Sequence, residues 1–256
     1  MAGQAGLKQM AGAVESDVRP PGRVLSRKAS NMPQDITIIG LPLPLRMGRV
    51  NSYLIRTGGG CVLIDAGGSN ARKVLHGHLE SAGCMPGSLQ LILLTHGDFD
   101  HIGNAAYLRS VFGAKIAMHR DDSGMAERGD MFVNRRRPNI LIRALLPIFT
   151  GFGTSERFTP DILLEDEYDL SQHGLEAKVI SLPGHSRGSI GVLTASGGLF
   201  CGDLFENTKV PALNSLMDDP VAANASTARL EALKIGTVYP GHGQPFEMAL
   251  LAEGAP

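Results

Sequence analysis

The chain has 256 residues, of which 43% are hydrophobic and 19% charged, and its formal net charge is −1. This length can hold one large domain or two small ones with a buried core, and the near-neutral charge gives no sign of a nucleic-acid partner or an acidic membrane surface. No apolar run approaches the roughly 20 residues that a membrane-spanning helix needs. The three cysteines lack C-x-x-C spacing, which argues against a disulfide framework and favours a reducing, cytoplasmic setting.

The first 34 residues are predicted to form a flexible tail ahead of a single domain over residues 35–256. The tail is polar, rich in glycine and alanine and mildly basic, and it has no apolar stretch of the kind that a secretory signal requires. A tail or an expression remnant is therefore the favoured interpretation. An amphipathic targeting peptide is the weaker alternative, because Glu15 and Asp17 interrupt it.

The first half of the domain alternates short apolar runs with helical patterns. Glycine and proline punctuate the runs, which is typical of strands joined by tight turns. The predicted order is three strands, a helix, a strand, a helix and a strand, over residues 36–39, 50–55, 61–64, 71–82, 91–94, 104–112 and 115–118.

Residues 121–160 break this rhythm and are predicted to form an inserted helical segment or lid. The segment contains the run Arg135-Arg136-Arg137. An apolar helical piece over residues 140–148 follows this run. A solvated face is the favoured interpretation of the arginines, and a patch that steers an anionic substrate is the alternative. For the apolar piece, packing or a homodimer contact is favoured over a wall of the substrate site.

The stretch His96-Gly97-Asp98-Phe99-Asp100-His101 places four metal-capable side chains within six residues. It follows an apolar run that is predicted to be a buried strand, and a strand end is a rigid platform for ligands. The spacing H-x-D-x-D-H cannot lie on one face of a regular helix or strand. It suits a loop that wraps around a metal ion.

The second half is predicted to contain four strands, a helix and a last short strand, over residues 163–164, 175–182, 190–193, 199–201, 222–233 and 235–239. Three of these strand ends carry one metal-capable residue beside a glycine, namely His185, Asp203 and His242. Glycine lets the backbone bend sharply enough for such a side chain to face inward. With the first loop they make seven candidate ligands, which is too many for one tetrahedral ion and suits two.

The sequence resembles the metallo-β-lactamase superfamily, which includes thioesterases of the glyoxalase II type and lactonases. The resemblance covers nearly the whole chain after about residue 36. The matching motifs are the His96 loop together with Asn51-Ser52-Tyr53-Leu54-Ile55, Leu63-Ile64-Asp65-Ala66-Gly67, Pro183-Gly184-His185, Gly202-Asp203 and Pro240-Gly241-His242-Gly243. It implies an α+β fold, a four-layer αβ/βα sandwich of two mixed β-sheets with outer helices and with metal ions at one edge.

The resemblance also implies a role for each candidate ligand. His96, His185 and Asp98 would hold the first of two divalent ions. Asp100, His101 and His242 would hold the second, and Asp203 would bridge the two. The superfamily places an aspartate at the position of Asp65 to support the ligand loops rather than to bind metal.

Asp98 is the main departure, because the superfamily motif is H-x-H-x-D-H. A carboxylate is a harder ligand than an imidazole, so it raises the relative affinity of the first site for iron or manganese. Zinc also accepts a carboxylate ligand and stays the favoured metal. The flavodiiron branch has a glutamate at this position and carries iron. Aspartate is shorter than glutamate, so contact between Asp98 and the metal through a water molecule is an alternative to direct binding. In a second alternative Asp98 does not bind, the first site is weak and the protein works with one ion.

The favoured function is a metal-dependent hydrolase of a small molecule, with a metal-bound hydroxide attacking an ester, thioester or lactone. In this hypothesis Asp100 orients the water and later moves a proton to the leaving group. β-Lactams are less expected because of Asp98. A non-haem iron oxidoreductase acting on oxygen or a persulfide is the alternative, and a metal-stabilised module without catalysis is third. Arg187 and His119 are weak candidates for substrate contact.

Overall fold

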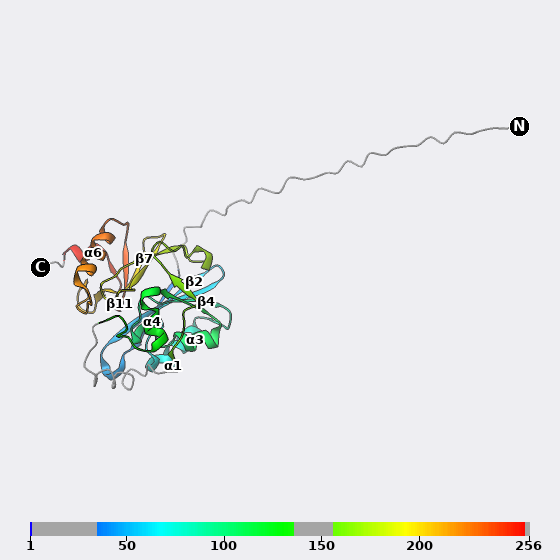
Figure 1. Ribbon diagram of the computed structural model, residues 1–256, viewed down its shortest axis with the longest axis horizontal. Helices are drawn as coiled ribbons and strands as arrows, with labels where there is room; N and C mark the ends of the chain where they lie inside the picture. Colours follow the sequence, from blue (N-terminus) through cyan, green and yellow to red (C-terminus); the bar gives the residue numbers. More distant parts are fainter. Residues whose placement is uncertain (2–34, 136–155, 254–256) are drawn as a thin grey trace. The chain divides into compact units, whose positions relative to one another are not determined.

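The computed structural model describes Met1, residues 35–135 and residues 156–253 (Figure 1). The predicted tail and the apolar piece over residues 140–148 lie outside these ranges. From residue 35 onward the described residues belong to one compact unit, Pro33–Pro256. None of the helices within these ranges has the length and apolar character that crossing a bilayer requires.

The first sheet has six strands in sequence order, β1-β2-β3-β4-β5-β6. β1, β2 and β3 pair antiparallel, and β3 to β6 pair parallel, so the sheet is mixed. Its strands span Ile36–Pro42, Arg49–Thr57, Gly60–Ile64, Leu89–Leu93, Lys115–His119 and Ile162–Leu164. The parallel strands end at the same edge of the sheet, where the loop from Thr95 to His101 follows β4.

The second sheet has the order β12-β11-β9-β8-β7, with β10 paired to β9. Only β11 and β9 run parallel, so this sheet is mixed as well. Its strands, from β7 to β12, span Ala177–Ser181, Ile190–Thr194, Leu199–Asn207, Ala212–Leu213, Thr237–Gly243 and Phe246–Glu247.

The helices lie between strands in the sequence, except for α7, which follows β12. Those with α-helical hydrogen bonding are α1 Arg72–Ser81, α2 Phe99–Ile102, α3 Ala105–Phe112, α4 Arg120–Arg128, α6 Pro220–Glu231 and α7 Leu250–Glu253. Single 3-10 turns occur at η1 Pro44–Arg46, η2 Ser69–Ala71 and η4 Ser171–His173. α6 starts with an aspartate cap, because the Asp219 carboxylate accepts hydrogen bonds from the backbone N–H groups of Val221 and Ala222.

Three clusters of buried hydrophobic side chains separate four layers. The first packs α1 and α3 on the outer face of the first sheet, with Leu54, Leu63, Leu75, Leu79, Ile92, Leu108 and Phe112. The second lies between the two sheets, with Tyr53, Ile55, Ile64, Leu93, Val192 and Phe200. The third packs α6 on the second sheet, with Ile180, Leu182, Ala223, Leu230 and Val238.

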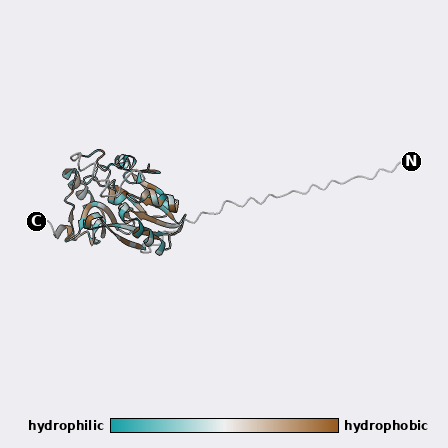
Figure 2. Ribbon diagram, turned by 90° about the horizontal axis from the view of Figure 1, so that it is seen from below, coloured by the Kyte–Doolittle hydropathy of each residue, from teal (hydrophilic) through white to brown (hydrophobic). Residues whose placement is uncertain are grey.

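Strand periodicity explains this layering. Leu54 faces the helices, whereas its neighbours Tyr53 and Ile55 face the other sheet, because successive side chains of a strand point to opposite faces. Hydrophobic residues accordingly dominate the strands in Figure 2. The predicted α+β fold, an αβ/βα sandwich of two mixed sheets with outer helices, is confirmed.

Two predicted boundaries are wrong in a way that matters for the site. Asp203 and His242 were expected at strand ends, but they lie inside β9 and β11. The parallel pairing of these strands shifts register between Tyr239 and Pro240 and again before His242. These irregularities turn the two side chains inward without ending the strands.

Candidate metal centre

Asp65 organises the loop that follows β4. This residue comes directly after β3 with a left-handed φ of 58°, and its carboxylate accepts three hydrogen bonds. The donors are the Thr95 backbone N–H, the Thr95 hydroxyl and His101 Nδ1, each at 2.8 Å. Because the Thr95 hydroxyl donates to Asp65, it accepts from His96 Nδ1 at 3.0 Å. Both histidines therefore keep Nε2 free for another partner, and Asp65 supports the ligand loop as predicted.

The other two candidate histidines are oriented in the same manner by backbone carbonyls. His185 Nδ1 donates to the Leu216 carbonyl at 2.6 Å. His242 Nδ1 donates to the Arg49 carbonyl at 2.8 Å. In neutral imidazole the second nitrogen is then an acceptor, which is the form that binds a metal ion.

The four Nε2 atoms converge on carboxylates rather than on donors. His185 Nε2 lies 3.0 Å from Asp98 Oδ2. Asp203 stands between the two halves of the cluster, with its Oδ1 3.3 Å from His101 Nε2 and its Oδ2 3.3 Å from His242 Nε2. Imidazole lone pairs and carboxylate oxygens repel one another unless a proton or a cation lies between them.

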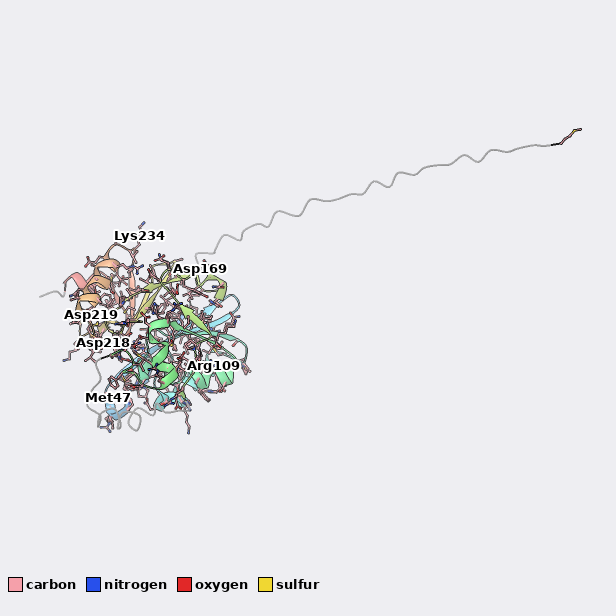
Figure 3. All side chains as sticks on the ribbon, viewed as in Figure 1. Met47, Arg109, Asp169, Asp218, Asp219 and Lys234 are labelled. Carbon is pink, nitrogen blue, oxygen red and sulfur yellow. The ribbon has the colours of Figure 1, made fainter. Side chains whose placement is uncertain are left out.

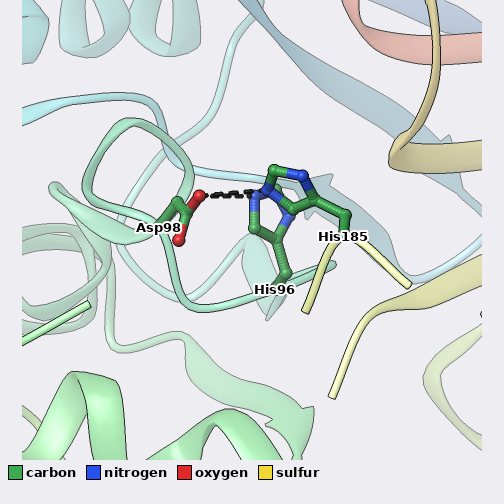
Figure 4. A group of neighbouring side chains, drawn as sticks. All are labelled: His96, Asp98 and His185. Carbon is green, nitrogen blue, oxygen red and sulfur yellow. Dashed lines mark hydrogen bonds and ion pairs between the residues drawn. The ribbon is translucent and has the colours of Figure 1, made fainter. Parts of the chain in front are cut away.

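All seven predicted ligands thus meet at one place. Ligand atoms lie within 4.8 Å of one another in three groups: His96 with Asp98 and His185, His96 with His101 and Asp203, and Asp100 with His101 and His242. The first group is drawn in Figure 4. His242 is the most exposed member, and its side chain retains only 16% of its accessible surface.

Asp100 stands on α2, a single helical turn inside the ligand loop. Its Oδ2 lies 3.5 Å from His242 Nε2 and 4.0 Å from His101 Nε2. Burial raises the pKa of Asp100, and the nearby Asp203 charge adds to this effect, while the charge of His101 opposes it.

Burial and charge act in opposite directions on the histidine cluster. Burial, together with the neighbouring His101 and His185, holds the pKa of His96 well below its usual value. For His242 burial acts in the same direction, but the Asp203 carboxylate outweighs it and raises the pKa to about 9. Asp203 keeps a pKa well below its usual value despite its burial, because His242 and His101 face it.

The donor set fits divalent metal ions. Within the described part of the chain, buried His96 Nε2, His101 Nε2 and Asp203 Oδ1 find no hydrogen-bond partner. Such orphaned acceptors are costly unless a cation occupies the space that they face. Four imidazoles and three carboxylates form a set that zinc, iron and manganese all accept.

Glycines make room for this convergence. A Cβ atom on Gly241 would lie 2.2 Å from Asp203 Oδ1 and 2.8 Å from His101 Cε1. Gly202 adopts a left-handed φ of +51°, and a Cβ there would lie 2.7 Å from the Thr95 hydroxyl. The left-handed φ of Gly202 agrees with the sharp bend predicted beside Asp203, and the close approach at Gly241 is a further role of glycine at the site.

β2 ties the first sheet to the ligand strand β11. Asn51 Nδ2 donates to the Pro240 carbonyl at 3.0 Å and to the Gly243 carbonyl at 2.8 Å. The Tyr53 hydroxyl donates to the same Pro240 carbonyl at 2.5 Å. These bonds hold the segment that carries His242 against the other half of the sandwich.

Sequence reasoning missed Asp122, a fully buried carboxylate on α4. It accepts hydrogen bonds from the Gly97 N–H at 2.9 Å, the Gly188 N–H at 2.9 Å and the Ser186 hydroxyl at 2.6 Å. It therefore braces the loop of His96 against the loop of His185. Nothing in its local spacing marks it, because its partners lie far away in the sequence.

Arg135 was also misjudged, because the solvated-face interpretation is wrong for this residue. Its side chain is 8% exposed, and its guanidinium pairs with the Asp98 carboxylate. Burial alone would raise the pKa of Asp98, but Arg135 and His185 outweigh it and hold that pKa well below its usual range. Arg136 and Arg137 lie outside the described residues.

The two weak candidates for substrate contact have different surroundings. His119 Nδ1 accepts the Asp121 N–H at 3.2 Å and so caps α4, which is a structural role. Arg187 is exposed and lines a cavity of about 270 Å³ with Arg135 and Asp218. Contact of either residue with a substrate stays a prediction.

An αβ/βα sandwich with such a cluster at the edge of its sheets defines a class of metal-binding proteins. The family model described as the metallo-beta-lactamase superfamily matches residues 45–242. This chain belongs to the metallo-β-lactamase superfamily, as its motifs predicted.

Curated relatives and solved structures agree with this assignment. Metallo-beta-lactamase domain-containing protein 1 of Homo sapiens is 29% identical over 211 residues, which cover 80% of this chain and 66% of that protein. Hydroxyacylglutathione hydrolase GloC of Haemophilus influenzae is 31% identical over 132 residues, 51% of this chain and 54% of that protein. The chain thus spans less than two thirds of both relatives. The crystal structure of TTHA1623 in a di-iron-bound form has a TM-score of 0.64 and 29% identity, covering 84% of this chain and 98% of that one.

Proposed function

We propose that this chain is a metal-dependent hydrolase of a small ester, thioester or lactone. The convergence of seven His and Asp side chains on one space carries the proposal, since four imidazole Nε2 atoms face three carboxylates there. The hydroxyacylglutathione hydrolase relative supports a thioester among the candidate substrates, although it matches only half of this chain.

His96, Asp98 and His185 would hold a first ion, Asp100, His101 and His242 a second, and Asp203 both. Two divalent ions in this set would supply Lewis acidity toward the substrate oxygen and would lower the pKa of water toward neutrality. Zinc is the proposed native metal, because zinc accepts imidazole and carboxylate ligands alike.

The chain's own groups would provide orientation and proton transfer. Asp65 and the two backbone carbonyls fix the histidine tautomers, so the acceptor nitrogens need no rearrangement. The buried Asp100 carboxylate would orient the attacking water and move a proton to the leaving group. Gly241 and Gly202 leave the space that the side chains of Asp203, His101 and Thr95 occupy.

A non-haem iron oxidoreductase is the second candidate, and Asp98 is the observation that favours it. A carboxylate in the first site shifts metal preference toward iron or manganese, and a structural relative at 29% identity was solved in a di-iron-bound form.

The cytoplasmic location and the homodimer stay predictions.

Elemental analysis of protein purified without added metal separates the two. We expect about two zinc ions per chain and turnover of a panel of aryl esters, lactones and acyl thioesters of glutathione, and Asp203→Ala should abolish that turnover. Iron as the main metal, with oxygen or persulfide consumption and no hydrolysis, would instead establish the oxidoreductase. A chain that binds neither metal would overturn both.

A further inference from the structure

Arg135 connects three separate loops around the first metal-ligand group. One guanidinium nitrogen pairs with Asp98 Oδ1, a second donates to the His185 carbonyl at 3.2 Å, and Nε lies 2.6 Å from Asp218 Oδ2. Asp218, labelled in Figure 3, precedes the cap residue of α6. Arginine suits this position, because its planar fork can serve several acceptors at fixed angles, whereas lysine presents a single point charge.

The two oxygens of Asp98 have different partners. Arg135 takes Oδ1. Oδ2 is left facing the candidate ligands, 3.0 Å from His185 Nε2 and 3.7 Å from His96 Nε2 (Figure 4). The contact with Arg135 therefore points the other oxygen into the space that the two imidazoles share.

Charge gives this arrangement a second consequence. A histidine at position 98 would be a neutral ligand, whereas aspartate adds a negative charge. Asp98 is only 7% exposed, so this charge is buried. A buried charge without a counter-charge is strongly unfavourable. Arg135 supplies that counter-charge from a side chain that is itself 8% exposed, whereas the side chain of its other partner, Asp218, is 42% exposed.

We propose that Arg135 is a positioning residue that makes Asp98 a metal ligand, by binding Oδ1, balancing the added charge and directing Oδ2 toward the ion shared with His96 and His185. This inference rests on the metal centre of the proposed function. It explains how a short carboxylate occupies a position where the superfamily motif has an imidazole. It also assigns a role to the only described residue of the arginine run.

Zinc titration of the metal-free protein by calorimetry tests the proposal, with unfolding temperature in chelator as a check on the fold. Arg135→Met should weaken one of the two zinc ions by about 10–100-fold, the usual effect of losing a group that orients a ligand, and leave the other unchanged. Asp98→His removes the need for a counter-charge, so Arg135→Met in that background should leave both ions at the affinity of Asp98→His alone. Arg120→Met is the matched control, because Arg120 pairs with Glu165 at the surface.

The outcomes separate this inference from the proposed function. Wild-type protein that binds no divalent ion would overturn both. Two ions in wild type and unchanged affinities in Arg135→Met would overturn the inference alone, and tighter binding in Arg135→Met would show that Arg135 withdraws Asp98 from the metal. If Arg135→Met does not fold, the double variant decides: a folded protein with two ions supports the proposal, and an unfolded one assigns Arg135 to the fold instead.

Discussion

Asp65 determines which nitrogen of His101 is available to bind a metal ion, although Asp65 is not itself a candidate ligand. In Asp65→Asn, an amide N–H₂ at the Oδ2 position would face two donors, the Thr95 hydroxyl and His101 Nδ1. His101 would accept a hydrogen bond from this amide by changing tautomer, so that Nδ1 loses its proton and Nε2 carries one. A protonated Nε2 can no longer bind a metal ion. We expect zinc affinity to fall about 10–100-fold, measured by competition with a chromophoric chelator.

Asp35→Asn is the matched control for this variant, because Asp35 is 68% exposed and pairs with Arg56 at the surface. Its zinc affinity should equal that of the wild type. Unchanged affinity in Asp65→Asn would contradict the tautomer assigned to His101.

Gly241 is the residue at which a single methyl group should damage the centre most directly. In Gly241→Ala the new Cβ would meet Asp203 Oδ1 at 2.2 Å, so the carboxylate or β11 must move. We expect zinc content to fall below one ion per chain and stability to drop by about 1–3 kcal/mol, the usual cost of overpacking. Gly236→Ala, whose Cβ meets nothing closer than 3.9 Å, should match the wild type in both elemental analysis and urea unfolding.

Residue patterns in the sequence located the candidate ligands, and the resemblance to the superfamily located Asp65, but neither identified Asp122 or the contact of Arg135 with Asp98. His96, Asp98 and His101 share one short loop, so their proximity is local and visible in the sequence. Asp122 and Arg135 reach their partners only because the path of α4 and its following turn brings them there. Such contacts depend on loop geometry, which no periodicity encodes.

At the scale of elements, α4 is the brace between the two ligand loops. Asp122→Asn would place an amide donor against the Gly97 N–H, the Gly188 N–H or the Ser186 hydroxyl, all of which now donate to the carboxylate. Leaving one or two buried donors unpaired should cost about 2–3 kcal/mol, measured by urea unfolding in chelator. The effect should be larger than that of Asp121→Asn, which changes the same helical turn but no bond between the loops.

A loss of stability without any loss of zinc affinity would contradict the bracing role of α4. A merely structural carboxylate would affect unfolding alone. Because Asp122 ties together the loops of His96 and His185, we expect both quantities to change together.

At the scale of the whole molecule, metal removal should destabilise the fold, because ions that bind only the native chain stabilise it by mass action. With free zinc at about 100 times its dissociation constant, one site contributes about 2.7 kcal/mol. For a domain of this size that corresponds to a shift in Tm of roughly 5–10 °C. We expect excess chelator to lower Tm by at least this amount in differential scanning calorimetry.

Asp203→Ala provides the comparison for metal removal, since this residue contacts both halves of the cluster. Its Tm should respond far less to chelator than that of the wild type. An equal response would mean that the ions bind elsewhere.

At the scale of the whole molecule, local patterns predicted the separate strands and helices, whereas their assembly into a sandwich was implied by the resemblance to the superfamily. The short apolar run in β2, which is buried on both faces, and the helical spacing in α1 are local patterns. The inward turns of β9 and β11 were not predictable from periodicity. They depend on a register shift between two parallel strands that α6 separates in sequence.

The Pro240 carbonyl has a consequence for how the protein is made. It accepts hydrogen bonds from Asn51 and Tyr53, which a ribosome would synthesise long before it. Until β11 emerges from the exit tunnel, the first sheet lacks these two bonds and the cluster lacks His242. A nascent chain should therefore acquire its full complement of ions only after β11 has left the exit tunnel, as a step that follows the synthesis of this strand rather than guiding it.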